Sequence, residues 1–98
     1  MSYSKELNFA ELHEKELDEK LRALSCKTRR GILGFIRGGP FTPREIAEQM
    51  GFELNTIKRH MKLLYSTQLV HQVKIGNIIT YQTNKIILAQ VAKEISDI

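Results

Sequence analysis

The sequence predicts a mainly α-helical domain that carries one small β-hairpin. Apolar residues recur at helical spacing through most of the chain, whereas residues 69–83 are rich in β-branched residues. The pair Gly76-Asn77 interrupts that segment and suits a tight two-residue turn. Two further helical patterns meet at Gly51. We therefore expect the order α-α-α-α-β-β-α.

Length and composition are those of one ordinary globular domain, which we place at residues 1–98. Apolar residues make up 42% and charged residues 27% of the chain. A chain of this size buries only about 60 to 68% of its unfolded surface, so a homodimer is expected. No apolar run approaches the roughly 20 residues of a membrane span, and the N-terminus lacks the apolar core of a secretion signal. We expect a cytoplasmic protein without membrane contact.

The charge is unevenly distributed along the chain. Residues 1–24 carry four basic and six acidic side chains, residues 25–83 carry nine and three, and residues 84–98 carry two of each. The formal charges of the three segments are therefore −2, +6 and 0. This division favours a central segment that meets a polyanion and ends that meet protein.

Residues 9–24 predict the first helix. Asn8 with Glu11 suits a capping box, and Leu7 with Leu12 suits a hydrophobic staple. The apolar residues of this helix form a narrow heptad-like seam flanked by charges. Such a seam favours packing against a partner helix over packing within the chain.

A second helix is expected to run to about Arg37, with Ser25 or Thr28 as its cap and Gly-Gly-Pro as its stop. Gly31 and Gly34 lie inside it, where each costs about 1 kcal/mol relative to alanine, so close packing is expected at both. The positions expected to face inward are Ile32, Leu33 and Ile36.

Residues 42–68 predict a helix-turn-helix. Thr42 with Glu45 forms a capping box, Pro43 suits the first helical position, and Gly51 suits the left-handed residue that ends the helix. The following helix is expected to begin at Leu54. Its apolar face is formed by Leu54, Ile57, Met61 and Leu64, and its other face carries Asn55, Thr56, Lys58, Arg59 and Lys62. Such a strip of donors suits a helix that enters a major groove about 12 Å wide.

The remaining chain predicts the hairpin and a final helix. Residues 69–83 form the hairpin, and Asn84 or Thr83 caps a helix over residues 84–98. That helix has a wide apolar face for a terminal element.

Several motifs occur in the order found in one family of regulators. They are Leu24-Ser25, Thr28-Arg29-Arg30, Ile32-Leu33, the run from Ile57 to Leu64, and Leu69-Val70. In this order they resemble the winged-helix repressors of the arsenical-repressor (ArsR) type over roughly residues 24–83. The resemblance implies a winged helix-turn-helix whose first and last helices pair across a two-fold axis. The dimer-interface residues expected on those helices are Leu17, Leu21, Leu24, Leu88, Val91 and Ile95.

The resemblance also implies double-stranded DNA as the partner. Lys58 and Arg59 are the first choice for contact, and Asn55 and Thr56 open the helix nearest the base edges. The hairpin has fewer cations than wings of the family usually carry, so Asn77 is the expected donor at its tip. The full set expected to contact DNA is Asn55, Thr56, Lys58, Arg59, Lys62, Arg44, Lys74 and Asn77.

Some neighbouring side chains have two plausible roles. Asn55 could cap its helix, and Glu53 could cap it or accept from a cytosine, with capping favoured. His60 either reaches a phosphate or packs beneath the helix, with packing favoured. Tyr65 and Tyr81 are expected to be partly buried core residues. Contact with the DNA backbone and a solvated face are equal alternatives for Arg29, Arg30 and Arg37.

Metal sensing is known in the resembled family, but its ligand sets are missing here. Cys26 is the only cysteine, and the last helix contains no histidine. His13 and Glu16 lie one turn apart and could form a zinc site only with symmetry mates. We expect no metal, no cofactor and no enzymatic activity, because no catalytic motif is present. The thiol of Cys26, beside Lys27, is either inert, which is favoured, or a redox sensor.

The sequence therefore predicts a homodimeric, sequence-specific DNA-binding transcription regulator that acts as a repressor on an inverted repeat. The alternative is a winged-helix protein-interaction module of the transcription machinery that does not bind DNA. The few cations of the hairpin and Glu53 at the helix start favour this alternative. A third hypothesis is an architectural protein that binds DNA without sequence preference.

Overall fold

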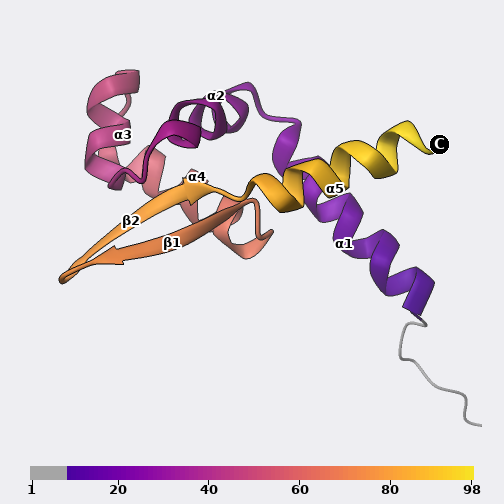
Figure 1. Ribbon diagram of the computed structural model, residues 1–98. Coiled ribbons are helices and arrows are strands. Elements are labelled where there is room, and N and C mark those ends of the chain that lie inside the picture. The colour runs from indigo at the N-terminus through magenta and orange to yellow at the C-terminus, as the bar shows by residue number, and fades with distance from the viewer. Residues whose placement is uncertain (1–8) are drawn as a thin grey trace, which may run out of the picture.

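The computed structural model describes residues 9–98 (Figure 1). Its helices and strands confirm the predicted fold class and element order. They are α1 (Phe9–Leu24), α2 (Lys27–Phe35), the short 3-10 helix η1 (Ile36–Gly38), α3 (Pro43–Met50), α4 (Leu54–Ser66), β1 (Val70–Ile75), β2 (Ile78–Thr83) and α5 (Lys85–Ser96). Within this part of the chain, no helix is long and apolar enough to cross a membrane. The cap and staple expected before α1 involve Leu7 and Asn8, which lie outside the described residues.

The hydrophobic core lies where α2, α3, α4 and the base of the hairpin meet. The hairpin projects from one side of this core, and α1 and α5 cross each other on the opposite side (Figure 1). The inward positions predicted for the second helix and for α4 are confirmed. Fully buried side chains include Ile32, Ile36, Ile46, Ile57, Met61 and Leu64.

The junction between α3 and α4 forms as its local sequence predicts. Thr42 Oγ1 accepts from the Glu45 N–H at 3.1 Å, and the Thr42 N–H donates to Glu45 Oε1 at 2.8 Å, which completes the capping box. Gly51 ends α3 with a left-handed φ of 73°. The chain therefore turns sharply, and α4 packs across α3.

The cap predicted for α2 was wrong. Cys26 occupies the N-cap position and makes no side-chain cap hydrogen bond. The hydroxyl of Ser25 instead donates to the Arg22 carbonyl at 2.6 Å, which belongs to the last turn of α1, and Thr28 lies inside the helix. The hydroxyl of Ser25 therefore serves the end of α1 and not the start of α2.

The glycines of the second helix also depart from expectation. A Cβ on Gly31 would lie 3.3 Å from the terminal carbon of Met50, but a Cβ on Gly34 would meet nothing within 4 Å. Close packing therefore applies to Gly31 and not to Gly34. Close approach is instead required at Gly39, where a Cβ would lie 2.1 Å from the ring of Phe41.

The hairpin is antiparallel, with Val70 opposite Thr83 at its base and Ile75 opposite Ile78 at its tip. A short bridge extends the base, because Phe41 and Tyr81 exchange backbone hydrogen bonds of 3.1 and 2.8 Å. The following helix has the predicted cap, since Asn84 Oδ1 accepts from the Ile87 N–H at 3.2 Å.

Candidate nucleic-acid interface

The two faces of α4 differ as predicted. Ile57, Met61 and Leu64 are 0 to 2% exposed and anchor the helix in the core. On the other face Asn55, Lys58, Arg59 and Lys62 are exposed, and Thr56 is half-buried. Within residues 9–98, none of these five side chains makes a hydrogen bond or an ion pair. Their donors are therefore available to a ligand.

The start of α4 lacks a side-chain cap. Glu53 occupies the N-cap position with extended backbone angles, but its carboxylate makes no cap hydrogen bond. Asn55 lies inside the helix and does not cap it. Glu53 therefore occupies the predicted N-cap position, but its side chain does not form the capping hydrogen bond. The carboxylate remains exposed near the positive end of the helix dipole.

The other residues expected to contact DNA come from two neighbouring elements. Arg44 lies in the first turn of α3, Lys74 lies in β1, and Asn77 lies in the turn at the tip of the hairpin. All three are exposed. The predicted contact residues are thus displayed on α3, α4 and the hairpin, with only Thr56 half-covered.

Arg29 and Arg30 have a role that no sequence pattern predicted. Arg29 Nε donates to the Ala23 carbonyl at 2.7 Å, and Arg30 Nη1 donates to the Leu24 carbonyl at 2.7 Å. These carbonyls belong to the last turn of α1, where backbone acceptors lack helical partners and the dipole favours cations. Both arginines therefore cap α1. Arg30 is nevertheless exposed, as a solvated face would have it, whereas Arg29 is half-buried; contact of either with DNA stays a prediction.

The guanidinium of Arg29 also reaches α4. Its Nη1 lies 3.3 Å from Nδ1 of half-buried His60 and donates to it when the ring is neutral, with its proton on Nε2. Burial lowers the pKa of His60, and the neighbouring charges of Arg29 and Arg59 lower it further. The neutral ring is therefore favoured. The packing role expected for His60 is confirmed.

The two tyrosines differ from each other. Tyr81 is half-buried as predicted, and its hydroxyl accepts from Gln72 Nε2 at 3.2 Å. Tyr65 is 48% exposed, so the prediction of a partly buried core residue was wrong for it. Its ring meets Tyr81 edge-on at a centroid distance of 6.3 Å. It covers the outside of the hairpin base and does not enter the core.

The thiol of Cys26 is half-buried at the start of α2. The backbone N–H of Arg29 is the main cause that lowers its pKa, with smaller contributions from the Thr28 N–H and from the charges of Arg29 and Arg30. Partial burial opposes this change. The start of the helix therefore lowers the thiol pKa, not the adjacent lysine.

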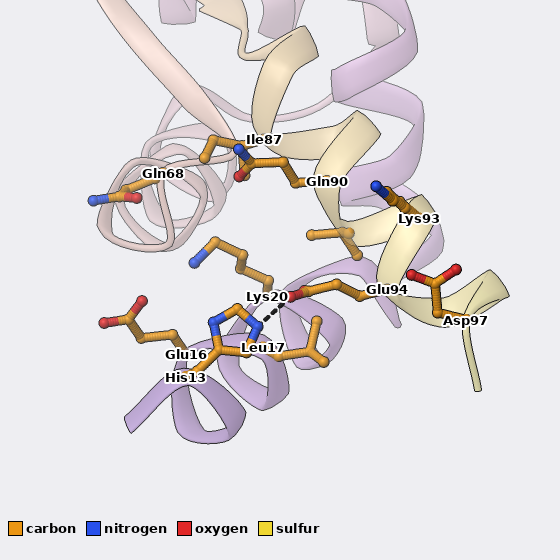
Figure 2. Close-up of a pocket in the computed structure, with 11 residues that line it drawn as sticks. His13, Glu16, Leu17, Lys20, Gln68, Ile87, Gln90, Lys93, Glu94 and Asp97 are labelled. Carbon is orange, nitrogen blue, oxygen red and sulfur yellow. Dashed lines mark hydrogen bonds and ion pairs between the residues drawn. The ribbon is translucent and has the colours of Figure 1, made fainter. Parts of the chain in front are cut away.

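A pocket of about 480 Å³ lies between α1 and α5 (Figure 2). His13 and Glu94 pair across it, so His13 is engaged within the chain. In the described part of the protein no three His, Cys, Asp or Glu side chains lie together as a metal site would require.

The predicted dimer-interface residues differ in how far the chain already covers them. Ile95 is 48% exposed, whereas Val91 is only 3% exposed because α5 lies against α1. Val91 therefore has little surface left for a second copy. The half-buried members of the set are Leu17, Leu21, Leu24 and Leu88.

A trihelical core with an exposed basic helix and a following hairpin defines a winged helix-turn-helix domain, a class of DNA-binding protein. Residues 24–73 match a family model described as a helix-turn-helix domain. An arsenical resistance operon repressor of Staphylococcus aureus is 33% identical over 82 residues, which cover 84% of this chain and 79% of that protein. The chain belongs to the ArsR-type family of winged helix-turn-helix transcriptional regulators.

Other relatives agree with this assignment. The transcriptional repressor SdpR of Bacillus subtilis (strain 168) is 29% identical over 72 residues, covering 74% of this chain and 80% of that protein. An ArsR-like transcriptional regulator from Rhodococcus sp. RHA1 superposes with a TM-score of 0.81 at 26% identity, covering 87% and 80% of the two chains. A homodimeric winged helix-turn-helix DNA-binding domain from Mycobacterium bovis shares the fold, with a TM-score of 0.78 at 19% identity over 97% and 91%.

Proposed function

We propose that this protein is a homodimeric repressor that binds an inverted-repeat operator in double-stranded DNA through α4. The observation that carries the proposal is the exposed face of α4, where Lys58, Arg59 and Lys62 have no partner among the residues of the described chain. Other cations of the same protein do find partners, as half-buried Arg29 does at the end of α1. The unpaired state of the α4 cations therefore suits a polyanion.

Each residue of the interface has a proposed role. Asn55 and Thr56 lie at the start of α4 and meet base edges, Lys58 and Arg59 bind phosphates or guanines, and Lys62 binds a phosphate. Arg44 on α3 and the hairpin residues Lys74 and Asn77 contact the flanking backbone.

The second copy is proposed to pack against α1 and α5. These helices leave large apolar side chains exposed, with Leu12 at 45% and Ile95 at 48%. A two-fold axis through this surface would present two α4 helices to one side of a duplex. Half-sites separated by about 34 to 36 Å, one turn of DNA, would then be read together.

Selection of bound duplexes from a random pool tests specificity and symmetry at once. A symmetric consensus with half-sites about one helical turn apart is expected. Titration of that duplex with Arg59→Ala should then give a dissociation constant about 10- to 100-fold higher.

Lys27→Ala is the matched control, because Lys27 is an exposed cation on α2, outside both the proposed DNA-contact residues and the proposed dimer helices. It should bind as the unmodified protein does. If the duplex pool yields no consensus, and neither protein binds duplex with micromolar affinity, the proposal fails and the protein-interaction module is favoured.

A further inference from the structure

The tip of the hairpin carries apolar side chains that nothing in the described chain covers. Ile75 and Ile78 are 56% and 57% exposed, and they lie opposite each other as the last pair of the two strands. Side chains of a directly opposed pair share one face of a hairpin. Ile79 is 46% exposed and belongs to the other face. Isoleucine therefore occupies both faces of the tip.

The tip is also narrow and far from the core. Gly76 has a positive φ of 63° and Asn77 does not, the pattern of a tight type II′ turn with two residues. No bulky loop therefore caps the strands. The tip of the hairpin projects beyond the helices and is the outermost point on that side of the molecule in Figure 1.

The surroundings of these isoleucines favour DNA over protein as the occupant. Residues 70–83 contain no acidic side chain, and the side chains of Lys74 and Asn77 at the tip both carry hydrogen-bond donors. A stable protein interface buries about 800 Å² on each partner, from some 20 to 30 residues, which a tip of three isoleucines does not provide. The hairpin is also continuous with the proposed DNA-binding surface, because β1 follows α4 and packs against it.

We propose that Ile75 and Ile78 form an apolar wedge that enters the minor groove beside the α4 site and partly unstacks one base step. This inference rests on the proposed function. Apolar wedges of this kind kink a duplex by about 20 to 90° towards the major groove, and unstacking costs a few kcal/mol per step. Lys74 and Asn77 then hold the flanking backbone, so the hairpin needs few cations.

A wedge makes the protein sensitive to how easily the flanking step deforms. Pyrimidine–purine steps such as TA unstack most readily, so they are expected at the wedge position of selected duplexes although no side chain reads their base edges. Permanganate oxidation of unstacked thymines in the complex locates that position.

The experiment compares the unmodified protein with the double variant Ile75→Thr/Ile78→Thr, which keeps β-branched residues in the strands. Two quantities are measured on the selected duplex: the bend angle by circular permutation, and the affinity for the duplex with and without one mismatch at the wedge position. The unmodified protein should bend DNA by tens of degrees and bind the mismatched duplex about tenfold tighter, because a mismatch reduces the unstacking cost. The variant should bend it little and bind both duplexes within about twofold.

Two further variants keep the comparison interpretable. Ile79→Thr removes a 46% exposed isoleucine from the opposite face of the same hairpin, outside the proposed wedge, and should change neither quantity. Ile78→Leu keeps the tip apolar and should retain the bend. Equal bending and equal mismatch preference in the double variant and the unmodified protein would overturn the wedge while leaving α4 binding intact. Self-association of the free protein that the double variant abolishes would also overturn it, in favour of a second copy. If the unmodified protein binds no duplex at all, the proposed function itself fails.

Discussion

Two pairs of cationic side chains in this protein have similar chemistry but differ in whether the fold provides them with hydrogen-bond partners. Arg29 and Arg30 donate to backbone carbonyls of α1, at 2.7 Å each. Lys58 and Arg59 on α4 have no hydrogen-bond or ion-pair partner within residues 9–98. The first pair stabilises the junction of two helices, and the second pair is available to a ligand. The difference teaches that a basic run in the sequence cannot be assigned to DNA before its backbone neighbours are known.

The largest expected difference between the two pairs is in their response to salt: DNA binding by the α4 cations should depend strongly on salt concentration, and the stability contributed by Arg29 and Arg30 should not. If the dimer neutralises 6 to 10 phosphates, its affinity for the selected duplex falls by about 10³- to 10⁵-fold between about 50 and 200 mM salt. Fluorescence anisotropy titrations at several salt concentrations measure this slope. The free energy of unfolding should change little over the same range, because the bonds of Arg29 and Arg30 to carbonyls do not release counterions. An affinity that is independent of salt would contradict phosphate binding by α4.

Arg29→Met and Arg59→Met should have opposite effects: the first should lower the stability of the fold, and the second should weaken DNA binding. Arg29→Met removes the donors at the end of α1 and the contact with His60, so the free energy of unfolding should fall by about 2 kcal/mol. Arg59→Met should change it by less than about 0.5 kcal/mol while weakening DNA binding. Urea denaturation at one fixed protein concentration measures both variants, since the stability of a dimer depends on concentration. If Arg59→Met lowers the free energy of unfolding, this side chain also stabilises the fold.

Two glycines test whether the turn that displays α4 is required. Gly51→Ala should destabilise the protein by about 1 to 2 kcal/mol, because φ is 73° there although a Cβ would meet nothing within 4 Å. Gly34→Ala lies in a helix with equally open space and should stabilise it by about 1 kcal/mol. Thermal unfolding followed by circular dichroism compares the two. If both substitutions change the stability equally and in the same direction, the left-handed backbone at Gly51 does not require glycine.

The smallest expected effect concerns His60, which lies between the two groups of cations. Its folded pKa is below the ordinary value of 6.5, so the unfolded chain binds more protons in the range between the two values. The stability that the neutral ring contributes is therefore complete above about pH 6.5 and is lost as the pH falls towards and through the folded pKa. Urea midpoints of the unmodified protein and His60→Gln should diverge at neutral pH and converge in acid. A constant difference between them would contradict the role of the neutral ring.

The elements that local chemistry specifies were predicted almost to the residue. The capping box of Thr42, the left-handed Gly51 and the cap by Asn84 each depend on residues within three positions, so a short sequence pattern contains all the participants. The face of α4 that points away from the core was predicted for the same reason. Its contacts with DNA stay a prediction.

Apart from the cap of α2, the features that were missed depend on how distant segments pack. Arg29 and Arg30 each reach back six residues across a helix junction, a contact for which no local pattern exists. Tyr65 has the spacing of the apolar residues of α4, but its exposure depends on where the hairpin lies. Spacing identifies which residues share a face. It does not identify which faces become covered.

The bridge between Phe41 and Tyr81 gives the hairpin a fixed root. Two antiparallel strands alone are only marginally stable in water, and this third short segment clamps the second strand near its middle. Phe41 directly precedes Thr42, whose side chain begins α3. A displacement of the hairpin tip would therefore be transmitted through the bridge at Phe41 to the N-terminus of α3.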